Sequence, residues 1–270
     1  MKIGIFDSGL GGLLIARSIK KYLPEYDYVY LGDTKRVPYG SRSHEVIYEF
    51  TCEALRYLFE KENCSLVILA CNTASSRALR KVQQEFLPKY FSNQKVLGVL
   101  IPTAEVVVSF NKIGVLATKA TVSSHTFKTE INKLNTKNNF SVKVFEQASP
   151  LLVPMIEEGE NKLAIPVLEK YLKPLLNKNI DALVLGCTHY PILKKEIKSL
   201  IPKNIKIISQ DEIIPKKLAD YLSSHPEINK KLSKKSSIKI LFTDITPTVE
   251  DLSQKWFGGN IKINKVKIDN

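Results

Sequence analysis

Short apolar runs alternate with longer amphipathic stretches along most of the chain. Residues 2–6 form the first apolar run, and residues 13–23 follow a glycine-rich turn with apolar side chains at helical spacing. The helical pattern ends at Pro24, and the alternation then recurs toward the C-terminus. This order predicts an α/β fold with mainly parallel, doubly wound sheets. We expect further strands over residues 26–31, 66–70, 96–100, 113–116, 142–145, 182–185, 205–208 and 238–242, with helices between most of them.

Two segments interrupt this alternation with polar and turn-forming residues. Residues 32–41 predict a long loop, which precedes a helical pattern over residues 43–61. Residues 132–139 read NKLNTKNN, and we expect them to form a polar surface loop rather than a linker between domains.

Parts of the first half of the chain recur in the second half at nearly constant separation. Residues 2–5 (KIGI) resemble residues 112–115 (KIGV), and the apolar run before Cys71 resembles the run before Cys187. We therefore expect two similar α/β halves. If the halves face each other, the two cysteine-ended strands would line a shared cleft, which is a common place for a small-molecule site.

Cys71 and Cys187 allow three interpretations. Each follows a predicted buried strand, where α/β folds place functional side chains, and either could be an inert core residue instead. A zinc site with His189 and Asp7 is a second possibility, although the paired knuckle of strong zinc motifs is missing. The third is acid–base catalysis by two thiols, because a helix N-terminus or an imidazolium lowers the pKa of a thiol.

The polar groups near the two cysteines are not duplicated. At the repeat separation, Asp7 corresponds to Ala117, and His189 corresponds to Thr73. Each half thus supplies one cysteine and one distinct neighbouring group. Two thiols on opposite sides of one ligand suit a reaction that removes a proton from one face and returns a proton to the other.

The glycine-rich turn over residues 7–12 does not match a nucleotide-binding motif. Leu14 occupies the position of the third glycine of the dinucleotide fingerprint, and the lysine of a phosphate-binding loop is absent. We expect these glycines to let the backbone approach a ligand closely and to start a helix whose free N–H groups favour a carboxylate.

Composition limits the location and the partners. The apolar fraction of 44% and the charged fraction of 25% are typical of a soluble globular protein. No apolar run reaches bilayer length and no export signal is recognisable, so we expect a cytoplasmic protein without membrane contact. The four cysteines are too few and scattered for a disulfide framework. The net charge is +13, but the basic residues form no dense stripe, so nucleic-acid binding is not expected.

Four motifs occur in order along the chain. They are Asp7-Ser8-Gly9-x-Gly11-Gly12, Val37-Pro38-Tyr39-Gly40, Ala70-Cys71-Asn72-Thr73-Ala74 and Gly186-Cys187-Thr188-His189-Tyr190-Pro191. Together they resemble the glutamate racemases of the aspartate/glutamate racemase superfamily. The resemblance implies a cofactor-independent and metal-free interconversion of L- and D-glutamate, which provides D-glutamate for peptidoglycan, and a homodimeric assembly.

The resemblance also implies roles for individual residues. Cys71 and Cys187 would be the two bases, with Asp7 assisting Cys71 and His189 assisting Cys187. Glu157 would support His189. The implied substrate-binding residues are Asp7, Ser8, Pro38, Tyr39, Gly40, Asn72, Thr73, Thr118, Thr188 and His189.

The family fold implies two pseudosymmetric α/β domains with the active site in the cleft between them. Residues 1–96 and 207–270 would form the first domain, and residues 97–206 the second. Two segments depart from the family pattern: residues 209–212 read SQDE in place of an Asp-Ser-Gly run, and residues 102–104 read PTA. We expect these departures to affect packing, regulation or the dimer interface rather than proton transfer.

Two alternative functions remain open at this point. A racemase for aspartate or another acidic amino acid is the first. A non-catalytic protein, either a metal-thiolate module or a basic nucleic-acid binder, is the second and belongs to a different class.

Overall fold

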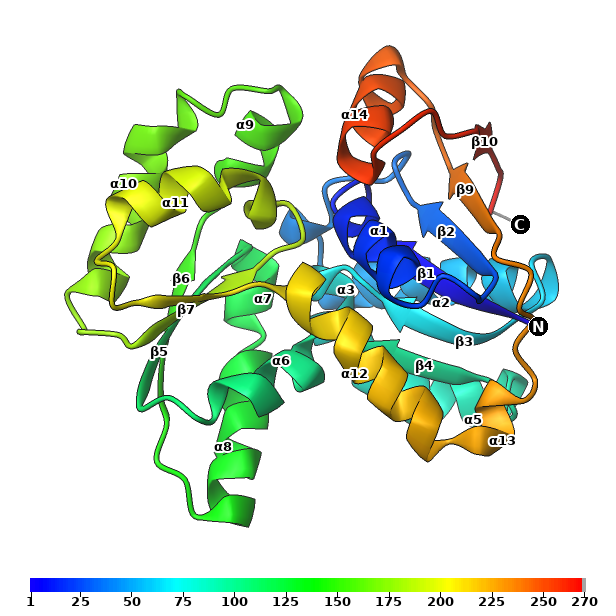
Figure 1. The fold of residues 1–270 in the computed structure, drawn as a ribbon, viewed down its shortest axis with the longest axis horizontal. Helices are drawn as coiled ribbons and strands as arrows, with labels where there is room; N and C mark the ends of the chain where they lie inside the picture. Colours follow the sequence, from blue (N-terminus) through cyan, green and yellow to red (C-terminus); the bar gives the residue numbers. More distant parts are fainter. Residues whose placement is uncertain (269–270) are drawn as a thin grey trace.

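The computed structural model describes residues 1–268, whose strands form two separate sheets (Figure 1). The first sheet has the strand order β10-β9-β2-β1-β3-β4, and the second has the order β6-β5-β7-β8. All these strand pairs are parallel, which confirms the predicted fold class. The strands are β1 (Lys2–Asp7), β2 (Tyr28–Gly32), β3 (Cys64–Leu69), β4 (Lys95–Gly98), β5 (Lys112–Ala117), β6 (Lys143–Ala148), β7 (Ala182–Gly186), β8 (Lys206–Ile208), β9 (Ile238–Phe242) and β10 (Ile263–Lys265).

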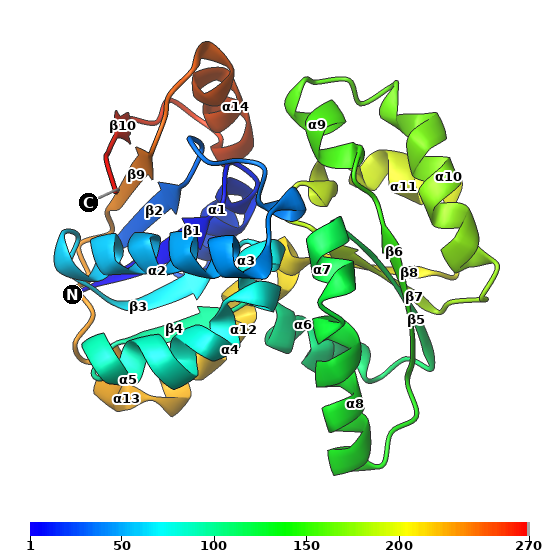
Figure 2. The same cartoon turned by 180° about the vertical axis from the view of Figure 1, so that it is seen from behind.

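Helices cover both faces of each sheet (Figure 2). Helices α1, α12 and α14 pack on one face of the first sheet and α2 on the other, while α10 and α11 lie opposite α6 and α8 on the second. No helix within residues 1–268 combines the length and apolarity needed to cross a bilayer. The helices are α1 (Gly12–Tyr22), η1 (Tyr39–Ser41), α2 (His44–Glu60), α3 (Asn72–Arg77), α4 (Leu79–Lys81), the π-helical turn η2 (Val82–Phe86), α5 (Leu87–Tyr90), α6 (Leu100–Val107), α7 (Lys119–Ser123), α8 (Thr126–Asn138), α9 (Leu152–Glu157), α10 (Ala164–Leu176), η3 (Tyr190–Leu193), α11 (Lys194–Leu200), α12 (Gln210–Ser224), α13 (Pro226–Asn229) and α14 (Pro247–Phe257).

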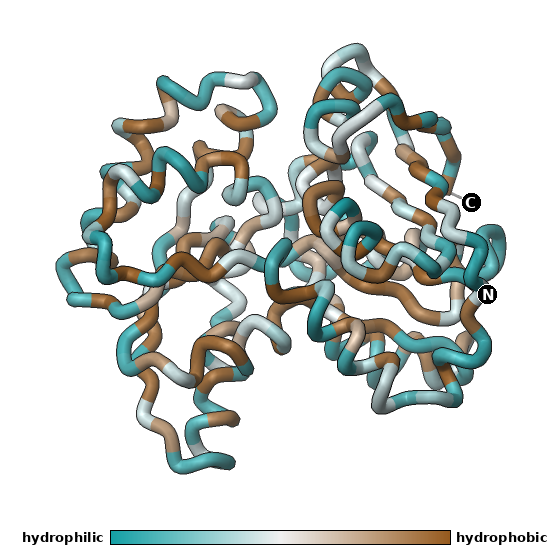
Figure 3. Tube along the Cα trace, in the orientation of Figure 1, coloured by the Kyte–Doolittle hydropathy of each residue, from teal (hydrophilic) through white to brown (hydrophobic). Residues whose placement is uncertain are grey.

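The central strands are buried on both faces, so their sequences are nearly continuous apolar runs (Figure 3). In β1, Ile5 joins the core with Leu13 of α1, and the next residue, Phe6, joins the separate core with Leu55 of α2. Because successive side chains of a strand point to opposite faces, a strand covered by helices on both sides needs apolar residues throughout. The central strands could be predicted from the sequence because of these apolar runs.

The chain passes between the two sheets twice. Helix α6 lies in the connection from β4 to β5, and α12 follows β8 and returns to pack against α1 of the first domain. The two crossover helices also contact each other. The domain limits given above stay a prediction, and the limit after residue 206 falls within β8.

The expectation of a surface loop over residues 132–139 is wrong, because most of this segment belongs to α8. Phe127 and Ile131 are fully buried, and Leu134 is partly buried on the same side of the helix. The Asn- and Lys-rich sequence is therefore the solvent face of an amphipathic helix. The helix ends at Asn138, and the C-cap residue Asn139 has a positive φ of 59° that closes the last turn.

Strand β10 was not predicted from the sequence. It contributes three residues, Ile263–Lys265, and pairs with β9 at the edge of the first sheet. Its side chains are partly buried or exposed, so its sequence lacks the apolar run that identified the central strands.

The buried face of α8 can be tested by mutation. Ile131→Ala is expected to lower the free energy of unfolding by about 2–5 kcal/mol, because it removes buried methyl groups and leaves a cavity. Asn132→Ala on the exposed face of the same helix is the control, with an expected change within about 0.5 kcal/mol. Urea titration followed by circular dichroism measures both. Equal effects of the two variants would contradict the assigned orientation of α8.

Candidate active site

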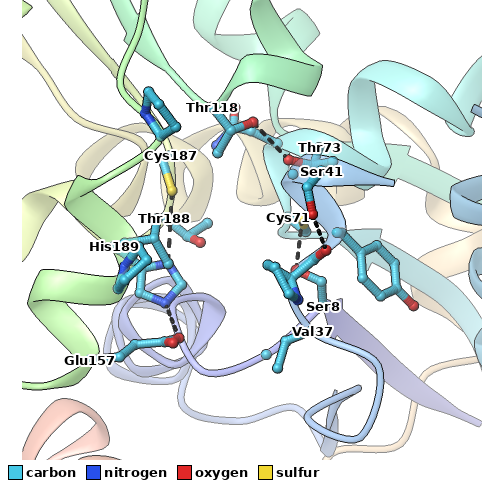
Figure 4. A pocket seen from close by; sticks show the side chains of 18 of the residues that line it. Ser8, Val37, Ser41, Cys71, Thr73, Thr118, Glu157, Cys187, Thr188 and His189 are labelled. Carbon is cyan, nitrogen blue, oxygen red and sulfur yellow. Dashed lines mark hydrogen bonds and ion pairs between the residues drawn. The ribbon is translucent and has the colours of Figure 1, made fainter. Parts of the chain in front are cut away.

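A cavity of about 340 Å³ lies between the two domains, within the size range of small-molecule sites. In Figure 4, Cys187 and His189 lie on one wall and Cys71 and Ser8 on the other. All the sequence-predicted site residues except Asp7 line this cavity. The lining residues are Ser8, Gly9, Val37, Pro38, Tyr39, Gly40, Ser41, Cys71, Asn72, Thr73, Thr118, Lys119, Ser149, Pro150, Val153, Pro154, Glu157, Glu158, Cys187, Thr188 and His189.

Strand ends supply the reactive side chains. Ser8 follows β1 and Cys71 follows β3, and these strands are neighbours in the first sheet. Thr118 follows β5 and Cys187 follows β7, which are neighbours in the second. Because parallel strands end at the same edge of a sheet, each pair of side chains lies together and faces the opposite pair.

Cys71 occupies the N-cap position of α3. Its Sγ accepts a hydrogen bond of 3.4 Å from the backbone N–H of Ala74 and lies 3.2 Å from Oγ of Ser8. Burial raises the pKa of the Cys71 thiol to about 12, and the nearby charge of Asp7 acts in the same direction. The two hydrogen bonds offset only part of this effect. Cys71 therefore carries its proton at neutral pH in this environment.

Cys187 has a different neighbour, the imidazole of His189. The Sγ of Cys187 lies 3.7 Å from Nδ1 of His189, and Nε2 on the other side of the ring lies 2.9 Å from Oε1 of Glu157. Burial lowers the pKa of His189, but the contacts with Cys187 and Glu157 outweigh it and raise that pKa to about 10. The ring is therefore an imidazolium at neutral pH, which places a cation beside Cys187.

Asp7 lies behind the cavity wall rather than on it. Its Oδ1 accepts a hydrogen bond of 2.8 Å from the backbone N–H of Gly9, and its Oδ2 accepts one of 3.4 Å from Oγ1 of Thr188. Burial raises the pKa of Asp7, and the charge of His189 partly offsets this effect. The carboxylate therefore bridges the turn after β1 and the loop after β7.

The missing side chain at Gly11 makes room for His189 and Thr188 rather than for a ligand, contrary to the expectation from the sequence. A Cβ at this position would lie 2.4 Å from Nδ1 of His189 and 2.4 Å from Oγ1 of Thr188. Gly12 similarly leaves room for the side chain of Asp7. The two glycines thus let the start of α1 approach Asp7 and, from the other domain, Thr188 and His189.

The hydroxyl of Tyr39 is hydrogen-bonded within the protein. It donates a hydrogen bond of 2.5 Å to Oδ2 of Asp33, which is fully buried. Asp33 also accepts hydrogen bonds of 2.6 Å from Nε of Arg36 and 2.8 Å from Oγ1 of Thr243. With its hydroxyl bound to Asp33, Tyr39 anchors the loop that brings Gly40 to the cavity.

The two domains touch beside the cavity. Oγ1 of Thr73 and Oγ1 of Thr118 share a hydrogen bond of 3.0 Å, and Nε of Arg77 donates one of 3.0 Å to the carbonyl of Ala120. These bonds join α3 of the first domain to α7 and its N-cap residue, Thr118, in the second. Both predicted threonines are therefore held in place by contact with the opposite domain.

Several lining residues were not identified from the sequence. Ser149 is one of them, because the predicted strand over residues 142–145 ended too early and β6 runs to Ala148. With the correct strand end, Ser149 would have been recognised by its position. Lys119 directly follows the predicted Thr118 and adds a basic side chain to the lining. The others are Gly9, Val37, Ser41, Pro150, Val153, Pro154 and Glu158.

The zinc interpretation lacks a ligand set in the described chain. Among residues 1–268, no three His, Cys, Asp or Glu side chains converge as metal ligands would. Cys71 and Cys187 come from separate walls, and their polar neighbours are satisfied by hydrogen bonds within the protein. The arrangement instead presents a neutral thiol on one wall and a sulfur next to a cation on the other.

Known proteins match the chain over nearly its whole length. A sequence profile described as Asp/Glu/Hydantoin racemase matches residues 13–212. The glutamate racemase of Persephonella marina is 39% identical over 273 aligned positions, which cover 99% of this chain and 98% of that protein. The crystal structure of the Francisella tularensis glutamate racemase in complex with D-glutamate has a TM-score of 0.88 at 32% identity, covering 99% of this chain and 98% of that one.

A second solved structure gives the same result. Glutamate racemase isoform RacE1 from Bacillus anthracis has a TM-score of 0.86 at 31% identity, covering 98% of this chain and 97% of that chain. Sequence and fold thus agree over nearly the whole chain, including both sheets. The chain belongs to the Asp/Glu/Hydantoin racemase family.

Proposed function

We propose that this protein is a glutamate racemase that interconverts L- and D-glutamate without a cofactor. The observation that carries the proposal is the placement of Cys71 and Cys187 on opposite walls of one cavity. Two groups so placed suit a reaction in which one removes a proton from one face of an α-carbon and the other returns a proton to the opposite face. The similarity to glutamate racemases over 99% of the chain supports glutamate as the substrate.

In the proposed mechanism, Cys187 is the base and Cys71 is the acid for one direction of the reaction. The imidazolium of His189, 3.7 Å from the sulfur of Cys187, would favour the thiolate form that a base requires. Cys71 carries its proton. The Cys187 thiolate takes the α-proton, and the electron pair of the broken C–H bond stays on the substrate. Cys71 then donates its proton to the opposite face. The sulfurs end with exchanged protonation states, so the same two steps run in reverse for the other enantiomer.

The carbanion-like intermediate requires stabilisation, because an amino-acid α-proton is only weakly acidic. Hydrogen-bond donors that are already oriented in a partly enclosed cavity provide it without reorganisation. We propose that these donors are the side chains of Ser8, Asn72, Thr73 and Thr118 and the backbone N–H of Thr188, which the cavity walls contribute from both domains. The loop at Pro38, Tyr39 and Gly40 would contribute through its backbone.

Asp7 would act on Cys71 through charge rather than through substrate contact. It raises the pKa of the Cys71 thiol. A base with a high pKa holds its proton until the carbanion-like species forms, and it readily takes a proton in the reverse reaction. Glu157 would play the corresponding part for His189, because it stabilises the imidazolium.

The wider biological setting belongs to the same proposal. We infer a cytoplasmic homodimer that supplies D-glutamate for peptidoglycan, as the family resemblance implies. The domain limits of 1–96 plus 207–270 and 97–206 are likewise proposed. The net charge of +13 suits an anionic substrate, because a positive field attracts anions over distances of about one Debye length, roughly 10 Å at 0.1 M salt.

The two-thiol mechanism predicts the behaviour of serine variants. Cys71→Ser and Cys187→Ser are each expected to lower kcat/KM for racemisation at least about 1,000-fold, because a serine hydroxyl is a far weaker base than a thiolate. Circular dichroism measures racemisation of both enantiomers of glutamate, with aspartate assayed in parallel. Cys52→Ser, in α2 and away from the cavity, is the control and should remain active. Near-normal rates in either active-site variant would exclude the proposed mechanism.

The charge state of His189 gives a separate prediction. Glu157→Gln removes a group that raises the pKa of His189, so this pKa is expected to fall from about 10 toward 6.5. The alkaline limb of the kcat/KM profile should then move to lower pH, and NMR titration of the imidazole should report the same shift. Glu158→Gln, which changes the neighbouring lining residue, is the control. An unchanged His189 titration in Glu157→Gln would contradict the ion pair.

A further inference from the structure

Two buried side chains from the crossover helices meet behind the cavity. Gln210 is the first residue of α12, and Thr103 lies in α6. Both belong to the segments that depart from the family pattern in the sequence. Their exposed fractions are 2% and 0%, and Asn72, which lines the cavity directly after Cys71, is also only 2% exposed.

The amides of Asn72 and Gln210 form a reciprocal pair. Nδ2 of Asn72 donates a hydrogen bond of 2.6 Å to Oε1 of Gln210, and Nε2 of Gln210 donates one of 2.8 Å to Oδ1 of Asn72. Such a pair alone does not fix the orientation, because both amides could rotate together and keep the same two bonds.

Thr103 removes this ambiguity. Its hydroxyl donates a hydrogen bond of 2.6 Å to the carbonyl of Val99, so its oxygen is left as an acceptor. Nε2 of Gln210 lies 3.2 Å from that oxygen and 3.5 Å from the carbonyl of Val99. Only the nitrogen of the Gln210 amide can face these two acceptors. The orientation of Gln210 then fixes the orientation of Asn72.

We propose that Gln210 is a positioning residue, which sets the amide of Asn72 for substrate binding through a hydrogen-bond chain that begins at Thr103. The pairing leaves one N–H and one lone pair of Asn72 for the substrate, each at a defined place. Thr103 and Gln210 belong to the two helices in the segments that cross between the domains. The hydrogen bonds from Thr103 through Gln210 to Asn72 therefore connect both crossover segments to the cavity. This role rests on the proposed racemase function.

Substitutions of Thr103 provide the sharpest test. A hydrogen-bonding role and a packing role predict opposite rankings of two variants. Thr103→Ser keeps the hydroxyl and loses a methyl group, whereas Thr103→Val keeps the volume and loses the hydroxyl. We expect Thr103→Ser to retain KM for glutamate within about twofold and Thr103→Val to raise KM about fivefold or more. If the site served packing alone, Thr103→Val would be the milder variant, and that ranking would overturn the proposal.

Gln210→Leu tests the middle of the chain. It is expected to raise KM for both enantiomers about tenfold with kcat nearly unchanged, because a contact present throughout the reaction acts mainly on KM. A smaller folded fraction would instead lower the apparent kcat and leave KM unchanged. In an Asn72→Ala background, Gln210→Leu should change KM less than twofold. Fully independent effects of the two substitutions would overturn a role through Asn72.

The wild-type protein, assayed alongside, separates the two proposals. An active wild type together with normal KM in Gln210→Leu and Thr103→Val would overturn only the positioning role. A folded wild type that racemises neither glutamate nor aspartate would overturn the proposed function and, with it, this inference.

Discussion

The parallel direction of the strands is the constraint on which the site depends. In each domain it brings the carboxyl ends of the central strands to one edge, and the two edges face each other across the cavity. Cys71 and Cys187 are therefore far apart in sequence but occupy corresponding places after β3 and β7. A sheet with antiparallel central strands would send neighbouring strand ends to opposite edges, and one cavity could not collect these side chains.

The two halves differ in the charge that each places near its sulfur. Cys71 lies near the buried carboxylate of Asp7, and Cys187 lies next to the imidazolium of His189. These neighbours are themselves connected, because Thr188 donates a hydrogen bond to Asp7 and the charge of His189 acts on the same carboxylate. A change in the protonation of Asp7 or of His189 therefore changes the pKa of the other group. The difference in charge between the two sulfur environments thus depends on residues from both domains.

Features carried by local patterns could be predicted from the sequence, and features that depend on distant contacts could not. The strands before Cys71 and Cys187 were recognisable because burial on both faces demands continuous apolar runs. The polar face of α8 has the composition of a loop, and the apolar residues that identify the helix are widely spaced in the sequence. The partners of Tyr39 and Asn72 lie in the core or on a crossover helix, and no local pattern identifies Asp33 or Gln210 as those partners.

Gly11 has no functional group, yet it determines how closely the two domains can approach. The backbone of α1 lies directly against His189 and Thr188, so any side chain at this position would force the domains apart. The distance between the two sulfurs depends on the same approach. A proton can pass to and from an α-carbon only over short distances, so the geometry of the proposed reaction is controlled in part by a residue that takes no part in its chemistry.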